Sequence, residues 1–456
     1  MDNDLCLVAD IGTSSIKAAI IDSQGNLLSF AREPFVYPDG RFDRLTPENL
    51  FHTFARAIGR LPERGNVSGV AFSGNGPTLI PLDQKGQAFD SVLLWVDKRD
   101  LRQEDTASFF LPKLAWFRQH QPAEFAKTKK VVSCAEYISF RLSGQLHTAS
   151  PSKAFDEVIW SSADILAYEF DKNLFPPFAR PGERIGQVRK SVAADLGLPT
   201  DVPCLAAGSD FLMSLLGTAT LQEGLVCDRA GSSEGLNYCT SNQCLDSRLR
   251  TLPHIAPEKW NVSGILNSTG LLFEWFRRFT GQEKIDYVEM LQRIRSARHP
   301  FPWFFPGLRA NADREFHHGV FYGLGADHGA AEMGRAVVES IGYALRETIE
   351  MLTQSVGPVR ALRACGGQAR NAPWNQMKAD MCGVPVQVPE IPEAELIGCA
   401  SCVFSYLDGR KAVDIAHDLV RYSEEYIPNK GEYQRFSADY VKYKKIYQSL
   451  RAIDAT

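Results

Sequence analysis

A glycine- and hydroxyl-rich turn near the start of the chain has the composition of a phosphate-binding loop. It lies in the sequence DIGTSSIK, which begins at Asp10. Gly12 lets backbone N–H groups approach phosphate oxygens closely, and the hydroxyls of Thr13 and Ser14 add donors. A carboxylate such as Asp10 can hold a hydrated Mg²⁺ ion, and Lys17 offers a positive charge to a phosphate. The same residue types are typical of ordinary β-hairpin turns, so this motif alone leaves both interpretations open.

Two further glycine-rich turns follow apolar segments in the second half of the chain. Gly231, Ser232 and Ser233 follow one strand-like run, and the sequence GGQARN, from Gly366 to Asn371, lies between a predicted strand and a predicted helix. A helix N-terminus preceded by glycines suits an anionic or purine ligand, although a tight turn is the simpler explanation for each motif. Three such turns after apolar segments favour a nucleotide site.

Residues 7–14 and 225–233 resemble each other. Both are apolar, strand-like segments that run into a glycine–hydroxyl turn. Two such hairpins, one in each half, indicate a duplicated domain with a cleft between the copies. The match is short, so a chance similarity is the alternative.

Asp210 stands between a run of small residues and the apolar segment 212–216. An aspartate that enters an apolar helix is either the N-cap of that helix or a base placed for catalysis. The residues around it leave both possibilities open.

The elements around these turns predict an α/β fold. Residues 5–9, residues 16–21 and a third run from Leu27 alternate with polar turns, which is typical of an antiparallel meander. Thr46 followed by Pro47 predicts the start of a helix, because threonine caps helices and proline favours the first helical position. The other elements predicted in this half are strands at 67–72 and 92–95 and helices through 103–143.

The second half alternates strands and helices in a similar way. Val337, Ile341 and Leu345 recur at helical spacing within a long predicted helix over 329–352. The charged tail, 412–450, predicts a closing helix pair that faces solvent. The other elements predicted here are strands at 319–325, 359–365 and 384–388 and a helix at 374–381. Mixed strands and helices in both halves indicate α/β domains.

Composition excludes several classes of protein. The chain has 456 residues, of which 44% are hydrophobic, so it can bury a core in two or three domains and is not intrinsically disordered. A net charge of −4 argues against a general nucleic-acid binder. The acidic N-terminus lacks a secretory signal, and no run of about 20 apolar residues could span a membrane. Ten cysteines are too sparse for a disulfide scaffold. We therefore expect a soluble, cytoplasmic protein with neither a nucleic-acid nor a membrane partner.

Six segments, in matching order and spacing, resemble the FGGY family of carbohydrate kinases. The likeness runs from about residue 5 to beyond residue 405, and the general layout is xylulokinase-like. The segments are DIGTSSIK at 10–17, LWVDKR at 94–99, KLAWF at 113–117, GSD at 208–210, GVFYGL at 319–324 and GGQARNAPWNQ at 366–376. Each is weak alone, but together they are specific.

The resemblance implies an α/β fold with two actin-like, ribonuclease H-like domains and an interdomain cleft. The N-terminal domain, 1–222, would hold the sugar pocket and the first phosphate loop. The C-terminal domain, 223–456, would hold the second phosphate loop and the adenosine site. The resemblance also implies that ATP binds in the cleft with Mg²⁺ and that its γ-phosphoryl group passes to a hydroxyl of a small carbohydrate. A homodimer is a further expectation from the family.

The resemblance also implies a role for particular residues. Asp210 falls at the position of the catalytic base, and Asp10 resembles the metal-associated carboxylate. The sugar-pocket positions are Asn75, Gly76, Trp95, Asp97 and Phe211. The first phosphate loop has Gly12, Thr13 and Ser14, to which the residue chemistry adds Lys17, and the second has Gly231, Ser232 and Ser233. The positions on the adenosine side are Gly270, Gly366, Gly367, Gln368 and Asn371.

Three positions depart from the family pattern. Glu234 directly follows the second phosphate loop, where many relatives have a small residue, and it could either repel ATP or help to bind metal. Ser209 stands where a glycine is common. The segment SGNGP at 73–77 lacks the Gln-Met-His typical of xylulokinases and the Gln-Arg-Glu typical of glycerol kinases.

We therefore expect ATP-dependent phosphorylation of a sugar or polyol hydroxyl, with a ketopentose as substrate and Asp210 as general base. A kinase for a sugar acid or another polyol is one alternative. A non-catalytic sugar or nucleotide sensor of kinase ancestry is another, motivated by Glu234. An actin-like structural ATPase ranks last, because no peptide-binding or polymer-forming appendage is evident.

Overall fold

The computed structural model divides into two compact units. The first comprises Met1–Ala219, Leu252–Glu258 and Ala394–Val420, and the second comprises Thr220–Thr251, Lys259–Glu393 and Arg421–Thr456. The residues that the structure describes are 4–37, 45–90, 92–95, 99–102, 106–297, 302–307 and 319–454. The change of unit after Ala219 lies near the boundary expected at 222 and 223, whereas residues 394–420 group with the first unit because their apolar helix packs there.

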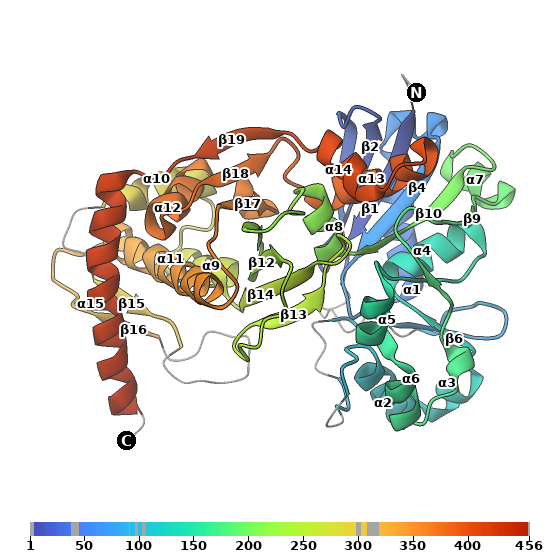
Figure 1. The fold of residues 1–456 in the computed structure, drawn as a ribbon, viewed down its shortest axis with the longest axis horizontal. Helices are drawn as coiled ribbons and strands as arrows, with labels where there is room; N and C mark the ends of the chain where they lie inside the picture. Colours follow the sequence, from blue (N-terminus) through green and yellow to red (C-terminus); the bar gives the residue numbers. More distant parts are fainter. Residues whose placement is uncertain are drawn as a thin grey trace. The chain divides into compact units, whose positions relative to one another are not determined.

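A six-stranded mixed sheet forms the centre of the first unit (Figure 1). Its strands, in spatial order, are β3 (Leu27–Pro34), β2 (Ser15–Asp22), β1 (Leu5–Ile11), β4 (Gly69–Gly74), β10 (Pro203–Ser209) and β9 (Arg184–Gln187). The first three form the antiparallel meander that the sequence predicts. β1, β4 and β10 run parallel to one another, and β9 is an antiparallel edge strand.

The second unit repeats this strand pattern in a seven-stranded sheet. Its strands, in spatial order, are β13 (Arg250–Pro253), β14 (Trp260–Leu266), β12 (Glu234–Thr240), β11 (Leu225–Ala230), β17 (Ala361–Cys365), β18 (Val386–Pro389) and β19 (Tyr422–Tyr426). β14, β12 and β11 are antiparallel, β11, β17 and β18 are parallel, and β19 is an antiparallel edge strand. The two similar sequence segments are therefore the first strands and turns of two domains of the same kind.

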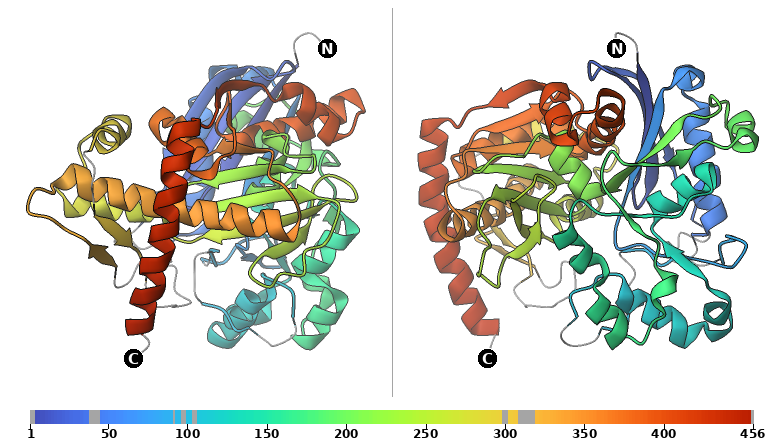
Figure 2. Two further views of the ribbon diagram at one scale, coloured as in Figure 1. Left: turned by 60° about the vertical axis from the view of Figure 1, so that its left-hand side comes forward. Right: turned by 45° about the vertical axis from the view of Figure 1, so that its right-hand side comes forward.

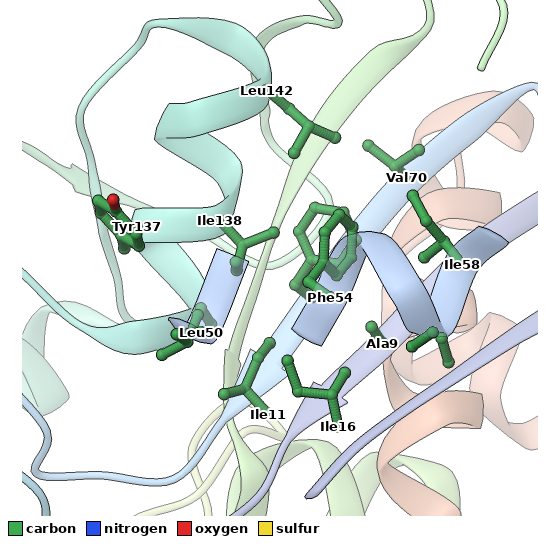
Figure 3. Packing of buried hydrophobic residues seen from close by; sticks show 14 of the residues in the cluster. Ala9, Ile11, Ile16, Leu50, Phe54, Ile58, Val70, Tyr137, Ile138 and Leu142 are labelled. Carbon is green, nitrogen blue, oxygen red and sulfur yellow. The ribbon is translucent and has the colours of Figure 1, made fainter. Parts of the chain in front are cut away.

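The first unit contains ten α-helices among the described residues. They are α1 (Pro47–Gly59), α2 (Leu111–His120), α3 (Pro122–Lys127), α4 (Cys134–Ser143), α5 (Lys153–Trp160), α6 (Ser162–Ala167), α7 (Lys190–Leu196), α8 (Asp210–Gly217), α13 (Ala394–Asp408) and α14 (Ala412–Leu419). Of these, α1, α4, α8 and α13 pack on strands of the sheet. Two short strand pairs, β5 (Ile80–Leu82) with β6 (Lys130–Val132) and β7 (Thr148–Ala149) with β8 (Phe178–Ala179), lie among them. Figure 3 shows Phe54 of α1 packed between Val70 of β4 and Ile138 of α4 in the core.

The helices of the second unit include two long ones, which Figure 2 shows from two sides. The helices are α9 (Thr269–Phe279), α10 (Tyr287–Arg295), α11 (Ala330–Ser355), α12 (Ala372–Cys382) and α15 (Lys430–Asp454), and a hairpin pairs β15 (Trp303–Phe305) with β16 (Val320–Tyr322). α11 packs on β12 and β14, and α12 packs on β18 and β19. Within the described residues, no helix is both long and apolar enough to cross a membrane.

The structure differs from the predicted elements at three places. Residues 92–95 make one isolated bridge, between Leu93 and Leu79, rather than a strand. The region predicted to be helical through 103–143 also contains β6. The tail, predicted as helices only, also contains β19. This strand pairs antiparallel with β18 and so satisfies backbone hydrogen-bonding groups of β18.

The N-terminus of α1 gives a test of the sequence-based capping argument. Thr46 Oγ1 accepts a hydrogen bond from the backbone N–H of Asn49 at 3.2 Å, and Pro47 occupies the first turn. Since this cap satisfies a helix N–H that would otherwise lack a partner, we expect Thr46→Ala to lower the free energy of unfolding by about 1 kcal/mol. Urea denaturation measures the change. The exposed Thr200→Ala is the control, and equal stability of the two variants would contradict the capping role.

Candidate functional site

The carboxyl ends of three neighbouring parallel strands bring together the first group of predicted residues. In the pairing of β1 with β4, Asp10 lies opposite Ser73, and in the pairing of β4 with β10, Gly74 lies opposite Ser209. Asp210 directly follows β10 as the first residue of α8. Asp10, the end of β4 and Asp210 therefore share one edge of the first sheet, which is the edge where α/β proteins bind ligands.

Asp10 is a buried carboxylate, with only 4% of its surface exposed. Its Oδ1 accepts a hydrogen bond from Ser73 Oγ at 2.8 Å. The pKa of Asp10 is raised to about 7, first by burial and then by the negative charges of Glu395 and Asp210, while Lys17 and the bond from Ser73 act in the opposite direction. Lys17 lies directly opposite Asp10 in the β1–β2 pairing. A cation bound beside Asp10 would favour its ionised form.

The turn between β1 and β2 is tight and partly exposed. The Gly12 N–H donates to the Ser15 carbonyl at 3.0 Å, and Ser14 faces solvent. A Cβ at Gly12 would lie 3.0 Å from that same carbonyl, so the turn leaves little room for a side chain. Trp95 Nε1 donates to Thr13 Oγ1 at 2.7 Å. This bond joins a residue predicted for the sugar pocket to one predicted for the phosphate loop.

Asp210 lies inside the first turn of α8, whose N-cap is Ser209. Its Oδ1 accepts a hydrogen bond from the backbone N–H of Phe211 at 2.7 Å, and its side chain is half-buried. Asp210 is therefore not the N-cap, although a helix N-terminus still favours its negative charge. The neighbouring Phe211 is also half-buried, and its ring centroid lies 6.1 Å from that of Phe155.

A third carboxylate, Glu395, was missed by the sequence analysis. It lies in the first turn of α13, is 6% exposed and accepts a hydrogen bond at Oε1 from Ser214 Oγ of α8 at 3.0 Å. Its negative charge acts on Asp10. Glu395, like Asp210, is an acidic residue at the start of a segment of small and apolar residues. The sequence pattern that singled out Asp210 could therefore have revealed Glu395 as well.

Close packing of α8 against α13 places Glu395. A Cβ at Gly217 would lie 1.7 Å from the Ala394 carbonyl oxygen, and a Cβ at Gly398 would lie 2.2 Å from the Met213 carbonyl oxygen. Only glycine at these two positions lets the helix backbones approach this closely.

The predicted sugar-pocket residues after β4 differ in their surroundings. Asn75 is 4% exposed, its Nδ2 donates to the Ile11 carbonyl at 3.0 Å, and its Oδ1 accepts from the Thr78 hydroxyl. The Asn75 side chain therefore ties the end of β4 to the end of β1. Gly76 is exposed. Asp97 lies outside the described residues.

The second glycine–hydroxyl turn joins β11 to β12. The Gly231 N–H donates to the Ser233 carbonyl at 2.9 Å, and Gly231 and Ser232 are exposed. The N-terminus of α9 lies beside this turn, since the Leu271 N–H donates to the Ser232 carbonyl at 3.1 Å. A Cβ at Gly270 would lie 2.1 Å from the Gly231 carbonyl oxygen, so the contact requires glycine.

The third glycine-rich segment adjoins this turn. Cys365 of β17 lies opposite Arg229 of β11, so the residues after these two parallel strands are neighbours. Gly366 has φ 84°, and a Cβ there would lie 2.8 Å from the Ala230 carbonyl oxygen. Gln368 Nε2 donates to the Gly231 carbonyl at 2.7 Å. Gly367 is exposed, and Asn371 is the N-cap of α12. The second unit thus gathers all its predicted nucleotide residues at one sheet edge.

Glu234 does not face the exposed side of the Gly231–Ser233 turn. It is 1% exposed, and its Oε1 lies 2.5 Å from Nζ of the buried Lys378. The same Nζ lies 2.6 Å from Asp228 Oδ2. The Glu234 side chain therefore points into the core and pairs with a lysine, so it does not offer an exposed carboxylate to ATP or to a metal ion at this turn.

The donor groups at the first sheet edge fit the way in which proteins bind Mg²⁺. Among the residues that the structure describes, no group of three or more His, Cys, Asp or Glu could hold a metal by itself. Magnesium, however, usually keeps several waters and takes one or two carboxylates together with substrate phosphates. The Asp10 carboxylate beside the side-chain-free Gly12 fits that manner of binding.

Comparison with known proteins assigns the class. The N-terminal domain model of the FGGY family of carbohydrate kinases matches residues 5–106 and 101–217, and the C-terminal domain model matches residues 229–405. The chain therefore belongs to the FGGY family of carbohydrate kinases, which are ATP-dependent transferases.

Individual relatives differ in the sugar that their names state. The chain is 24% identical to the xylulose kinase of Staphylococcus epidermidis over 100% of this chain and 99% of that protein. It is also 24% identical to the gluconokinase of Bacillus subtilis over 92% of this chain and 91% of that protein. Among solved structures, a xylulose kinase from Brucella ovis matches with a TM-score of 0.85 at 20% identity, covering 98% of this chain and 100% of that one. These likenesses confirm the predicted fold class and the kinase family.

Proposed function

We propose that this sugar kinase transfers the γ-phosphoryl group of ATP to a hydroxyl of a ketopentose. In this proposal the N-terminal domain supplies the sugar pocket and the first phosphate loop, and the C-terminal domain supplies the second phosphate loop and the adenosine site. The observation that carries the proposal is the half-buried Asp210 on the same sheet edge as Asp10 and next to the end of β4.

Asp210 is the proposed general base. Its Oδ1 is oriented by the Phe211 N–H at 2.7 Å, and the carboxylate remains partly accessible to a ligand. Phosphoryl transfer needs positioning and charge neutralisation more than covalent help, so a fixed carboxylate that accepts the hydroxyl proton late is sufficient. Glu395, one helix away, adds negative charge to this edge, and that charge raises the pKa of Asp10.

Asp10 and Lys17 are the proposed charged groups near the phosphates. Mg²⁺, when bound, supplies positive charge that neutralises the transferring phosphoryl group. Asp10 would hold the ion together with water, and Lys17, opposite it on β2, would offer a direct charge to a phosphate oxygen. The exposed N–H groups of the two glycine–hydroxyl turns would donate to the remaining oxygens.

The charge at the first sheet edge favours a neutral sugar over a sugar acid. The negative charges of Asp210 and Glu395 act on the Asp10 carboxyl there, with Lys17 as the nearby cation. A substrate carboxylate would be repelled by these groups, whereas the hydroxyls of a ketopentose can donate to them. The gluconokinase among the relatives keeps a sugar acid as the second candidate.

The burial of Glu234 bears on the alternative of a non-catalytic sensor. That alternative is motivated by Glu234 beside the second phosphate loop, and the Glu234 side chain is buried against Lys378 rather than exposed to a ligand.

Sugar-dependent ADP release tests the proposal. The purified chain is incubated with ATP and Mg²⁺ and, in separate reactions, with xylulose, ribulose, glycerol and gluconate. We expect the largest kcat/KM with one of the two ketopentoses. A larger value with gluconate or glycerol would overturn the substrate assignment, and tight ATP binding without turnover on any sugar would overturn the enzymatic proposal.

Trp95 provides a more local test. Trp95→Phe keeps the aromatic face but removes the 2.7 Å hydrogen bond to Thr13 Oγ1. Since such a bond is worth about 0.5–1.5 kcal/mol, we expect kcat/KM for the sugar to fall about threefold to tenfold. Steady-state kinetics measure the change. Trp116→Phe, which keeps the ring stacked on His120, is the matched control. An equal effect in both variants would contradict a specific role for Trp95.

A further inference from the structure

Three charged side chains are buried together directly behind the second glycine–hydroxyl turn. Asp228 on β11, Glu234 at the start of β12 and Lys378 on α12 are each no more than 1% exposed. Asp228 and Glu234 lie diagonally across the β11–β12 pair, on one face of the sheet. Lys378 Nζ lies 2.6 Å from Asp228 Oδ2 and 2.5 Å from Glu234 Oε1. One cation therefore serves two carboxylates in the core.

These three residues connect to the turn by two routes. Glu234 immediately follows Ser233, so its position fixes the end of the turn along the backbone. Through α12, Lys378 lies 5.4 Å from the centroid of the Trp374 ring, and Trp374 Nε1 donates to Gln368 Oε1 at 3.0 Å. Gln368 Nε2 in turn donates to the Gly231 carbonyl at 2.7 Å. Both ends of the turn are thus connected to the buried charges.

The charge balance of the group depends on one proton. Two ionised carboxylates and one ammonium would leave a net negative charge in a dry interior, which is costly. Asp228 Oδ1 and Glu234 Oε2 are buried and accept no hydrogen bond from the described residues. A proton on Glu234 leaves one carboxylate paired with one ammonium, and the region behind the turn then carries no net charge.

We propose that Asp228, Glu234 and Lys378 form a positioning cluster that holds the Gly231–Ser233 turn in its phosphate-binding shape and keeps the charge behind it neutral. The inference rests on the proposed function only in taking this turn as a nucleotide site. None of the three residues touches the reacting atoms. Their effect on the reaction is exerted through the turn, and so on nucleotide affinity rather than on the chemical step.

The titration of Glu234 gives the cluster a recognisable pH dependence. Burial raises the pKa of Glu234 to about 8, the charge of Asp228 raises it in the same direction, and Lys378 opposes both. Asp228 from β11 and Lys378 from α12 are the charged groups that act on it. Cys382, also on α12, is close to both carboxylates, and burial raises the pKa of its thiol to about 12. As the pH rises through the pKa of Glu234, this residue loses its proton and adds a negative charge behind the Gly231–Ser233 turn.

We therefore expect ADP binding to weaken as the pH rises. In the wild-type protein the Kd for ADP, measured by isothermal titration calorimetry with Mg²⁺, should rise about tenfold between pH 7 and pH 9.5, because a nearby negative charge repels phosphate. Glu234→Gln has nearly the same shape and cannot ionise. It should bind ADP within about threefold of wild type at pH 7 and lose the alkaline weakening.

Removal of the cation should also weaken ADP binding, and already at pH 7. Lys378→Met leaves Asp228 buried without its partner, and we expect the Kd for ADP at pH 7 to rise at least tenfold. The double variant Asp228→Asn/Lys378→Met restores neutrality and should recover most of that loss. Glu339→Gln is the matched control, since Glu339 is a buried carboxylate paired with Arg335 at 2.5 Å on α11 and is not connected to the turn by these bonds. Its ADP affinity and pH profile should equal those of wild type.

The outcomes separate this inference from the proposed function. If the wild-type protein binds ADP but Glu234→Gln keeps the alkaline weakening, or Lys378→Met and Glu339→Gln lose affinity equally, the positioning cluster is refuted and the kinase proposal stands. If Lys378→Met does not fold, the pH profile of Glu234→Gln decides alone. If the wild-type protein binds no ADP at any pH, the nucleotide site itself is refuted, and the inference with it.

Discussion

Asp210→Asn should lower kcat by about 10²–10⁴-fold, which is the usual contribution of a general base. Asparagine has almost the same size, and its Oδ1 can still accept the 2.7 Å hydrogen bond from the Phe211 N–H. The substitution therefore removes the proton acceptor and leaves the local geometry in place. Steady-state kinetics with the preferred sugar measure kcat, while thermal unfolding and ADP binding should remain close to the wild-type values.

Asp171→Asn is the control for this substitution. Asp171 is an exposed aspartate that caps a short helix in the same unit and accepts a hydrogen bond from Asn173 N–H at 2.9 Å. It should keep wild-type turnover. Asp210→Asn with a kcat within about threefold of wild type would contradict the role of general base, because that loss is far below the contribution of such a group.

Gly270→Ala should raise the Kd for ADP by about 10–100-fold, because the added methyl group cannot be accommodated. The Cβ of an alanine at position 270 would lie 2.1 Å from the Gly231 carbonyl oxygen and 3.2 Å from Gln368 Nε2. Either α9 or the turn must move, and overpacking of this kind costs about 1–3 kcal/mol. Calorimetric titration with ADP measures the effect, and kcat at saturating ATP should change much less.

Gly59→Ala is the matched control for Gly270→Ala, since a Cβ at Gly59 would meet nothing within 4 Å. It should bind ADP as the wild-type protein does. Unchanged ADP affinity in Gly270→Ala would show that the Gly231 turn does not hold the nucleotide.

Local sequence patterns were sufficient to predict the hairpins that contain the glycine turns. The apolar runs at 5–9 and 16–21, separated by a polar turn, correspond to β1 and β2, and Thr46 caps α1 as predicted. These features depend on residues that are neighbours in the sequence. The same holds for Asp210, whose place at the start of a helix follows from the small and apolar residues around it.

Features that depend on distant residues could not be predicted in this way. Lys378 is separated from Asp228 by 150 residues, and a lysine in a polar helix is usually expected to face solvent. The residues next to Glu234 in the sequence predict a place beside a phosphate loop. They do not show that its side chain is buried in the core. Pairing of the three charges depends on which face of the sheet α12 covers, and that is a property of the tertiary fold.

The position of Glu395 near Asp10 also could not be predicted from local sequence. Its sequence neighbours suggest only an apolar helix with an acidic residue near its start. Its place near Asp10 results from the packing of α13 against α8, where Gly217 and Gly398 let the backbones meet.

The role of Asn75 also depends on distant residues. The hydrogen bond from its amide to the Ile11 carbonyl, at 3.0 Å, joins the ends of two strands that are about 60 residues apart in the sequence.

The stoichiometry of the reaction tests the central claim most directly. The chain is supplied with ATP, Mg²⁺ and its preferred sugar, and ADP and phosphorylated sugar are quantified in the same sample by phosphorus NMR. A sugar kinase that uses Asp210 as its base must form the two products in equal amounts in the wild-type protein and almost none of either with Asp210→Asn. ADP that accumulates without sugar phosphate, or equal product formation by the two proteins, would contradict it.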